Sequence, residues 1–229
     1  MSELEAIRRR YQRRNAEAGA VYSPLNRPAH NAQVELERVL LRMLRETGFQ
    51  EFHDIDLLEV GAGNGSNLLR LIRWGFDPSR LTANELLEDR IVEARKCLPS
   101  IVTVVPGDAR AITGSERFDL VLQSTVFSSV LDDEVQQGLA NSMWRLLRPG
   151  GSIISFDFAF NNPKNPDVRA VPTSRIRSLF PDGELRVRKL TLAPPVARRL
   201  GGRPSVYAAL GTISALRTHR LAFIRKPAA

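Results

Sequence analysis

The chain has 229 residues, of which 43% are hydrophobic and 25% charged, and its formal net charge is +8. This length and composition are typical of a globular protein with one large core. No apolar run reaches the roughly 18 residues of a membrane-spanning helix, and the polar N-terminus lacks the apolar segment of a secretory signal. The single cysteine, Cys97, excludes an internal disulfide framework and a cysteine-based metal site. We expect a cytoplasmic protein.

Arginine dominates the positive charge, which is concentrated in the first fourteen residues and between residues 169 and 203. A positive field of this kind attracts nucleic acids, phosphorylated molecules or anionic membrane surfaces. Charge alone does not choose among these partners.

The predicted elements begin with helices and then alternate between strands and helices. A basic helix over 1–17 is followed by a connector with two prolines and by an amphipathic helix from His30 to Thr47. Short apolar or β-branched runs after that predict strands, and amphipathic runs predict helices. The predicted strands are 55–60, 81–85, 101–105, 118–124, 152–158, 184–192 and 219–226, and the predicted helices between them are 67–74, 87–97, 134–147 and 175–180.

This alternation predicts an α/β fold with a doubly wound, Rossmann-like sheet of seven mostly parallel strands and helices on both faces. Residues 1–50 are expected to form a helical cap and residues 51–229 the main domain, with an insertion at about 193–216. In such a sheet, ligands bind outside the carboxyl ends of the strands. The candidate functional residues should therefore lie along that one rim.

A glycine-rich loop follows the first predicted strand, with glycines at 61, 63 and 65. The dinucleotide fingerprint requires its third glycine one position later, where this chain has Ser66. S-adenosylmethionine carries no phosphate, and it needs a glycine turn that lets the backbone come close without a clash from Cβ atoms. The acidic Glu59 before the turn also suits a cationic amine or sulfonium better than a pyrophosphate. The loop thus favours S-adenosylmethionine over a nicotinamide dinucleotide.

Two acidic residues follow the next strands. Glu85 ends the second predicted strand, where a carboxylate accepts hydrogen bonds from ribose hydroxyls. Asp108 follows the third strand and is a candidate acceptor for the adenine amine, although an aspartate after glycine is also a common turn former.

Five motifs in order carry a resemblance to the class I S-adenosylmethionine-dependent methyltransferases. The motifs are LLEVGAGNG, the strand-ending Glu85, GDA at 107–109, FDLVLQS, and LLRPGGSI at 146–153. The later segments LQSTVFSSVLDD, FDFAFNNPKNPDVR, RIRSLFP, LTLAPP and LRTHRLAFIRKP resemble a bacterial subgroup of this superfamily associated with polysaccharide or secondary-metabolite pathways. The first resemblance spans about residues 54–158, and the second extends it over nearly the whole chain.

The resemblance implies roles for individual positions. Glu59, Gly61, Gly63 and Gly65 would line the methionine part of the cofactor, and Glu85 would bind its ribose. Leu86, Asp108 and Ala109 would contact the adenine, and Gln123 with Ser124 would lie beneath the methyl group. The resemblance also implies an antiparallel last strand, which would place Arg217 and His219 on the same rim.

Methyl transfer to a hydroxyl benefits from a general base. The candidates are His30, at a helix start in the predicted cap, Asp157, at the end of the fifth parallel strand, and His219. Each also has a structural interpretation, as a cap, a strand-end carboxylate or a strand histidine. Metal assistance is not expected, because the fourth strand ends in Gln123 and Ser124 rather than a carboxylate.

The loop after the fifth predicted strand, NNPKNPDVR, is the expected acceptor loop. The amides of Asn161, Asn162 and Asn165 both donate and accept hydrogen bonds and suit a hydroxyl-rich ligand such as a sugar, although Asn-Pro pairs are also good turn formers. The N-P-P-Y pattern of base-methylating enzymes is absent, which argues against a nucleic-acid amine.

The predicted function is O-methylation of a small molecule or glycan, and RNA methylation is the alternative that the positive charge suggests. A module that binds the cofactor without turnover and a nicotinamide dehydrogenase rank below these two. Tyr11 and Tyr22 are candidate cofactor contacts in the cap. The stretch 193–216 is expected to wall the site or, through Arg198, Arg199 and Arg203, to touch a membrane surface.

Overall fold

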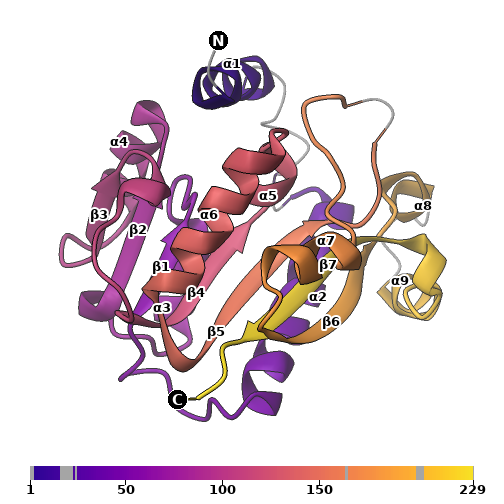
Figure 1. Ribbon diagram of the computed structural model, residues 1–229. Coiled ribbons are helices and arrows are strands. Elements are labelled where there is room, and N and C mark those ends of the chain that lie inside the picture. Colours follow the sequence, from indigo (N-terminus) through magenta and orange to yellow (C-terminus); the bar gives the residue numbers. More distant parts are fainter. Residues whose placement is uncertain (1–2, 16–22, 24, 163–164, 200–203, 229) are drawn as a thin grey trace.

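The computed structural model describes residues 3–15, 23, 25–162, 165–199 and 204–228. Its centre is a seven-stranded sheet of order β3-β2-β1-β4-β5-β7-β6 (Figure 1). The strands β1 to β5 are parallel, and β7 is antiparallel to both of its neighbours, β5 and β6. The predicted fold class and the antiparallel last strand are confirmed. The strands are β1 Leu57–Val60, β2 Leu81–Glu85, β3 Thr103–Pro106, β4 Phe118–Ser124, β5 Leu147–Phe158, β6 Glu184–Leu192 and β7 Arg217–Arg225.

Helices cover both faces of the sheet because its central strands are apolar on both faces. Successive side chains of a strand point to opposite faces, so Leu57 of β1 lies in one core cluster and Leu58 in the other. The first cluster includes side chains of α2 and α3, and the second includes side chains of α5, α6 and α7. The helices are α1 Glu3–Asn15, α2 Arg27–Glu46, α3 Ser66–Arg73, α4 Glu88–Cys97, α5 Val126–Ser129, α6 Asp133–Leu146, α7 Thr173–Leu179, α8 Pro194–Arg199 and α9 Pro204–Leu210.

Most predicted elements agree with the structure within a few residues, and the strands 81–85, 118–124 and 184–192 agree in both bounds. Helix α2 begins three residues before the predicted His30, because Pro28 is well suited to the first turn of a helix. Strand β5 begins at Leu147 rather than at residue 152, so the LRPGG motif lies within the strand. A Cβ atom on Gly151 would lie 2.8 Å from the carbonyl oxygen of Asp119, which explains the need for glycine there.

Helix α1 lies on the segment that follows β4, above the carboxyl rim of the sheet (Figure 1). Arg10 Nη2 donates to the carbonyl oxygen of Ser129 at 3.0 Å, and Tyr11 Oη lies 3.2 Å from Ser129 Oγ. The Leu131 N–H donates to Glu3 Oε1 at 2.9 Å. The first helix thus covers the rim of its own chain. The predicted contact at Tyr22 and the predicted membrane contact at Arg203 lie outside the described residues.

A buried carboxylate joins α2 to the far edge of the sheet. Glu35 accepts hydrogen bonds from Arg217 Nη1 at 2.6 Å, from the Thr191 N–H at 3.0 Å and from Tyr207 Oη at 3.2 Å. Its side chain is 6% exposed. Since a buried charge is tolerated only when it is paired and hydrogen-bonded, this cluster fixes the position of α2 and α9 relative to β6 and β7. No helix in the described part of the chain is long and apolar enough to span a bilayer.

We expect Glu35→Ala to lower the free energy of unfolding by about 3 kcal/mol, because it leaves the Arg217 guanidinium half-buried without its partner. The matched control is Glu46→Ala, which removes the exposed partner of Arg188 and should change stability by less than about 0.5 kcal/mol. Urea unfolding followed by circular dichroism measures both variants. Equal effects of the two substitutions would contradict the role given to Glu35.

Candidate cofactor and acceptor site

The candidate site lies where the chain changes direction within the sheet. From β1 the chain continues through β2 and β3 toward one edge, and from β4 through β5 toward the other. Val60, the last residue of β1, is in register with Asn84 of β2 and with Gln123 of β4. The strand ends that carry Glu59, Glu85 and Gln123 therefore meet at one rim. This is the topological switch point at which doubly wound sheets bind ligands.

The glycine loop between β1 and α3 has a backbone that other residues adopt only with strain. Gly61, Gly63 and Gly65 have φ angles of 68°, 58° and 84°. Space is restricted as well, since a Cβ atom on Gly61 would lie 2.5 Å from Val126 Cγ2 and one on Gly65 2.7 Å from Leu98 Cγ. The loop packs closely between α4 and α5 and leads directly into helix α3.

Glu59 is a fully buried carboxylic acid at the base of this loop. Its Oε1 accepts a hydrogen bond from Asn67 Nδ2 at 2.6 Å, whereas Oε2 is buried without a hydrogen-bond partner among the described residues. Burial raises the pKa of Glu59 to about 8, because the charged form is poorly solvated there. A positively charged ligand group next to Oε2 would favour the ionised form.

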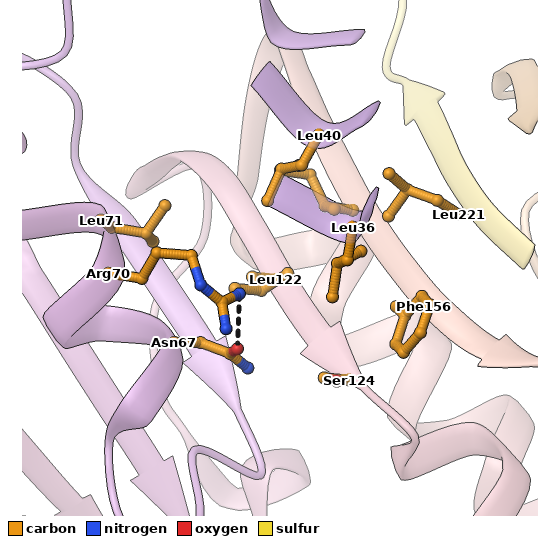
Figure 2. A pocket seen from close by; sticks show the side chains of 10 residues that line it. Leu36, Leu40, Asn67, Arg70, Leu71, Leu122, Ser124, Phe156 and Leu221 are labelled. Carbon is orange, nitrogen blue, oxygen red and sulfur yellow. Dashed lines mark hydrogen bonds between the residues drawn. The ribbon is translucent and has the colours of Figure 1, made fainter. Parts of the chain in front are cut away.

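Asn67 and the neighbouring Arg70 border a small cavity between α2, α3 and the sheet (Figure 2). Arg70 Nη1 donates to Asn67 Oδ1 at 3.2 Å, and Arg70 Nε lies 3.1 Å from Glu37 Oε1. The cavity volume is about 20 Å³, enough for one water molecule. Figure 2 shows Ser124 and Phe156 bordering the same cavity from the sheet.

Glu85 joins the end of β2 to the glycine loop. Its Oε2 accepts from the Gly63 N–H at 2.7 Å, and its Oε1 accepts from the N–H groups of Leu86 at 2.7 Å and Leu87 at 3.0 Å. Its place at the rim is predicted by the sequence, whereas its hydrogen bond to the glycine loop has no local sequence signal.

Asp108 lies in a local ion pair, with Oδ2 accepting from Arg110 Nε at 2.9 Å and from Nη2 at 2.7 Å. Its Oδ1 accepts from the Arg110 N–H. The adjacent Ala109 is buried, and Leu86 at the end of β2 is half-buried. The structure thus places Asp108 and Ala109 after β3 as predicted, with the Asp108 oxygens engaged by Arg110.

Gln123 and Ser124 point to opposite faces of the sheet because they are consecutive in β4. Gln123 is buried on the α5 face, where its Nε2 donates to Asp157 Oδ2 and to Ser155 Oγ. Asp157 Oδ1 accepts from the Ser128 N–H at 2.9 Å. Burial raises the pKa of Asp157 to about 6. Asp157 therefore ties β5 to β4 and to the start of α5.

His219, at the start of β7, lies between two phenylalanine rings of β5. Its ring stacks on Phe156 with a centroid separation of 4.9 Å and packs against Phe158 at 4.6 Å. Its Nδ1 is 3.0 Å from Thr218 Oγ1, whose single proton is directed to the carbonyl oxygen of Thr191. In the tautomer that allows both contacts, Oγ1 donates to the Thr191 carbonyl oxygen and accepts from Nδ1, which leaves the lone pair on Nε2. Burial lowers the pKa of His219 to about 4, so the imidazole is neutral near pH 7.

The remaining predicted residues are near the surface. His30 is exposed in the first turn of α2. Asn161 and Asn162 are exposed, and the Asn161 Oδ1 accepts from the Ala170 N–H at 2.7 Å. Asn165 Oδ1 accepts from the Asp167 N–H at 3.1 Å. These contacts shape the loop after β5, and they do not bring its asparagines together with His30.

A doubly wound sheet with a glycine loop and two acidic strand ends at its switch point is an arrangement in which enzymes bind nucleoside-containing cofactors. Residues 57–151 match the profile of a family described as a methyltransferase domain. No curated protein gives a significant match.

Solved structures of the same fold include an S-adenosylmethionine-dependent methyltransferase from Mesorhizobium loti, with a TM-score of 0.61, 15% identity, and coverage of 81% of this chain and 96% of that one. The phosphoethanolamine N-methyltransferase 2 of Haemonchus contortus, solved with phosphomonomethylethanolamine and S-adenosylhomocysteine, has a TM-score of 0.59, 16% identity, and coverage of 82% and 52%. The cyclase SpnF has a TM-score of 0.59, 16% identity, and coverage of 83% and 80%.

Residues 57–151 therefore match a methyltransferase domain, and the chain has the fold of solved S-adenosylmethionine-dependent methyltransferases. The five motifs of the first resemblance lie within or next to the matched segment. The finer assignment to a bacterial subgroup stays a prediction.

We expect Glu59→Gln to stabilise the protein by an amount that grows with pH. The folded-state pKa of about 8 lies above the unfolded value near 4.5, so Glu59 stabilises the fold fully below pH 4.5, and this contribution is lost as the pH rises toward 8. Relative to the wild type, the variant should gain about 3 kcal/mol in the free energy of unfolding between pH 5 and 7.5. Urea titrations across this range measure the difference. A difference independent of pH would mean that Glu59 ionises normally in the folded protein.

Proposed function

We propose that the chain transfers the methyl group of S-adenosylmethionine to a hydroxyl oxygen of a small-molecule or glycan acceptor, with His219 as the general base. The observation that carries this proposal is the His219 imidazole held between Phe156 and Phe158, at the rim that also carries the glycine loop. His219 is partly exposed, and its Nε2 makes no hydrogen bond to the described residues, so Nε2 is available to accept from an acceptor hydroxyl.

The cofactor is proposed to lie across the switch point. Glu59 and the loop Gly61–Gly63–Gly65 would hold its methionine part, since the unpartnered Glu59 Oε2 suits an ammonium group. Glu85 would accept from the ribose, and Leu86, Asp108 and Ala109 would border the adenine. Gln123 and Ser124 would lie beneath the methyl group, where the Gln123 side chain is held by Asp157.

Methyl transfer is an in-line displacement at an activated sulfonium carbon, so the protein contributes mainly alignment. As the acceptor oxygen bonds to the methyl carbon, the carbon–sulfur bond breaks and its electron pair goes to the sulfur. The hydroxyl proton goes to His219 Nε2. The stacked rings of Phe156 and Phe158 hold the imidazole in one orientation, which reduces the entropy lost in reaching this geometry.

Two other predicted bases are proposed in lesser roles. Asp157 has a raised pKa, but its oxygens accept hydrogen bonds from Gln123, Ser155 and the Ser128 N–H, so it suits the positioning of Gln123. His30 is exposed at the start of α2 and would contact only an acceptor that reaches over the cap. The proposed acceptor loop, with Asn161, Asn162 and Asn165, begins three residues after Phe158 and would bind the acceptor beyond the reacting hydroxyl.

The acceptor class is tested with purified protein, methyl-labelled S-adenosylmethionine and a cell extract divided into nucleic-acid, lipid-plus-glycan and small-metabolite fractions. Label that enters the glycan or metabolite fraction and resists nuclease supports the proposal. Label that enters RNA overturns it and identifies the alternative, an RNA methyltransferase. If the protein bound S-adenosylhomocysteine but labelled no fraction, it would bind the cofactor without transferring the methyl group to these acceptors. This outcome is informative because the same fold also occurs in a cyclase.

We expect His219→Gln to reduce the rate of label transfer at least a hundredfold, the range that a general base contributes. The affinity for S-adenosylhomocysteine, measured by calorimetry, should stay within a factor of two. His53→Gln replaces an exposed histidine that precedes β1, at the end of the sheet opposite the rim; it is the control and should leave both quantities unchanged. Unchanged transfer in His219→Gln would exclude this histidine as the base.

The second variant is Glu85→Gln, which we expect to weaken S-adenosylhomocysteine binding by at least tenfold. The substitution replaces a charged acceptor for the ribose and for the Gly63 N–H, and hydrogen bonds to charged groups contribute about 1.5–3 kcal/mol. Glu88→Gln removes a neighbouring exposed carboxylate and should bind like the wild type. If both variants bound equally well, Glu85 would not contact the cofactor.

A further inference from the structure

Two cations lie directly opposite each other in the antiparallel pair β6–β7. Lys189 is in register with Arg220, and Arg220 is in register on its other side with Asp157 of β5. Like charges at opposed strand positions destabilise a sheet. Asp157 makes no ion pair with Arg220, and its oxygens accept from Gln123, Ser155 and the Ser128 N–H instead. The arrangement therefore has excess positive charge at the rim.

Arg220 is the more unusual of the two cations, since it is only 9% exposed. Its Nη1 donates to the carbonyl oxygens of Ala159 at 2.9 Å and Val171 at 3.2 Å, and its Nε is buried without a partner. Nη2 makes no hydrogen bond to the described residues, so its donors are available to a ligand. Within the described part of the chain, no carboxylate lies at ion-pair distance from the Arg220 guanidinium, whose pKa is lowered by burial.

Phe160 brings the two cations to the same place. Its ring is 49% exposed, with Lys189 Nζ 5.6 Å and Arg220 Cζ 5.9 Å from the ring centroid. Phe160 follows the end of β5 and precedes Asn161, so the two charges lie at the base of the proposed acceptor loop. An aromatic ring holds cations in position but supplies no counter-charge.

We propose that Arg220, Lys189 and Phe160 form a binding site for the anionic group, a phosphate or carboxylate, of the methyl acceptor. The identity of the ligand as the methyl acceptor rests on the proposed function. The binding of an anion at this place does not depend on it. It narrows the acceptor class to molecules that carry a negative charge apart from the hydroxyl that is methylated. Nη2 and Nζ would share the anion, which would relieve the repulsion between the two cations.

A single anionic group fits the site better than a polyanion. The other arginines around the loop are already engaged, since Arg169 and Arg175 pair with Asp133 and Arg217 pairs with Glu35. Nucleic-acid binding requires a series of free cations that contact successive phosphates.

The test measures binding of inorganic phosphate and of acetate to the full chain by calorimetry at low ionic strength, in the wild type and in Lys189→Gln. We expect saturable binding of one anion by the wild type and at least tenfold weaker binding by the variant. Arg225→Gln, an exposed arginine at the opposite end of β7, is the matched control and should bind like the wild type. Thermal unfolding of each variant verifies that the fold is intact. The ratio of phosphate to acetate affinity distinguishes the two kinds of anion.

Absence of saturable binding to the wild type, or equal binding by the wild type and Lys189→Gln, would overturn the proposal. An RNA oligonucleotide that displaced phosphate and bound more tightly than it, with loss of affinity in Lys189→Gln, would also overturn it and assign the site to a nucleic-acid surface. Because the measurement uses neither the cofactor nor methyl transfer, failure of the anion site and failure of the proposed function are distinguishable.

Discussion

The parallel pairing of β1 with β2 on one side and β4 on the other is the constraint on which the rest of the structure depends. Because this register brings three strand ends together, the glycine loop after Val60 comes within hydrogen-bonding distance of Glu85. The same pairing sends the chain in opposite directions from the centre of the sheet and opens the crevice in which ligands bind. A register shift of one residue would turn Glu59 to the other face and remove it from this place.

The rim contains buried polar groups that the fold tolerates at a cost. Glu59 and Asp157 both have raised pKa values because burial disfavours their charged forms. The cost of burying Asp157 is offset by its hydrogen bonds with Gln123 and Ser155, whereas Glu59 retains an oxygen without a partner among the described residues. Incomplete compensation of this kind is expected at a binding site, where the ligand supplies the missing partner.

Much of the fold was predictable from the sequence because local pattern and tertiary structure agree. Strands such as 118–124 are buried on both faces and have an unmistakable apolar run, and Gly61, Gly63 and Gly65 carry their own conformational signal. Long-range polar contacts have no such signal. Glu35 lies in an amphipathic helix where a glutamate is ordinarily solvated, yet it binds Arg217, 182 positions away. The stacking of His219 on Phe156 depends in the same way on the pairing of β5 with β7, which the residues alone do not encode locally.

The most direct test of the account is a crystal structure of the protein with S-adenosylhomocysteine. We predict that the ligand spans the switch point, with its amino group at Glu59 Oε2 and its ribose hydroxyls on Glu85. Its sulfur should be directed along the rim toward the stacked ring of His219. A ligand bound elsewhere, or bound with its sulfur directed away from His219, would contradict the assignment of this rim as the site of methyl transfer.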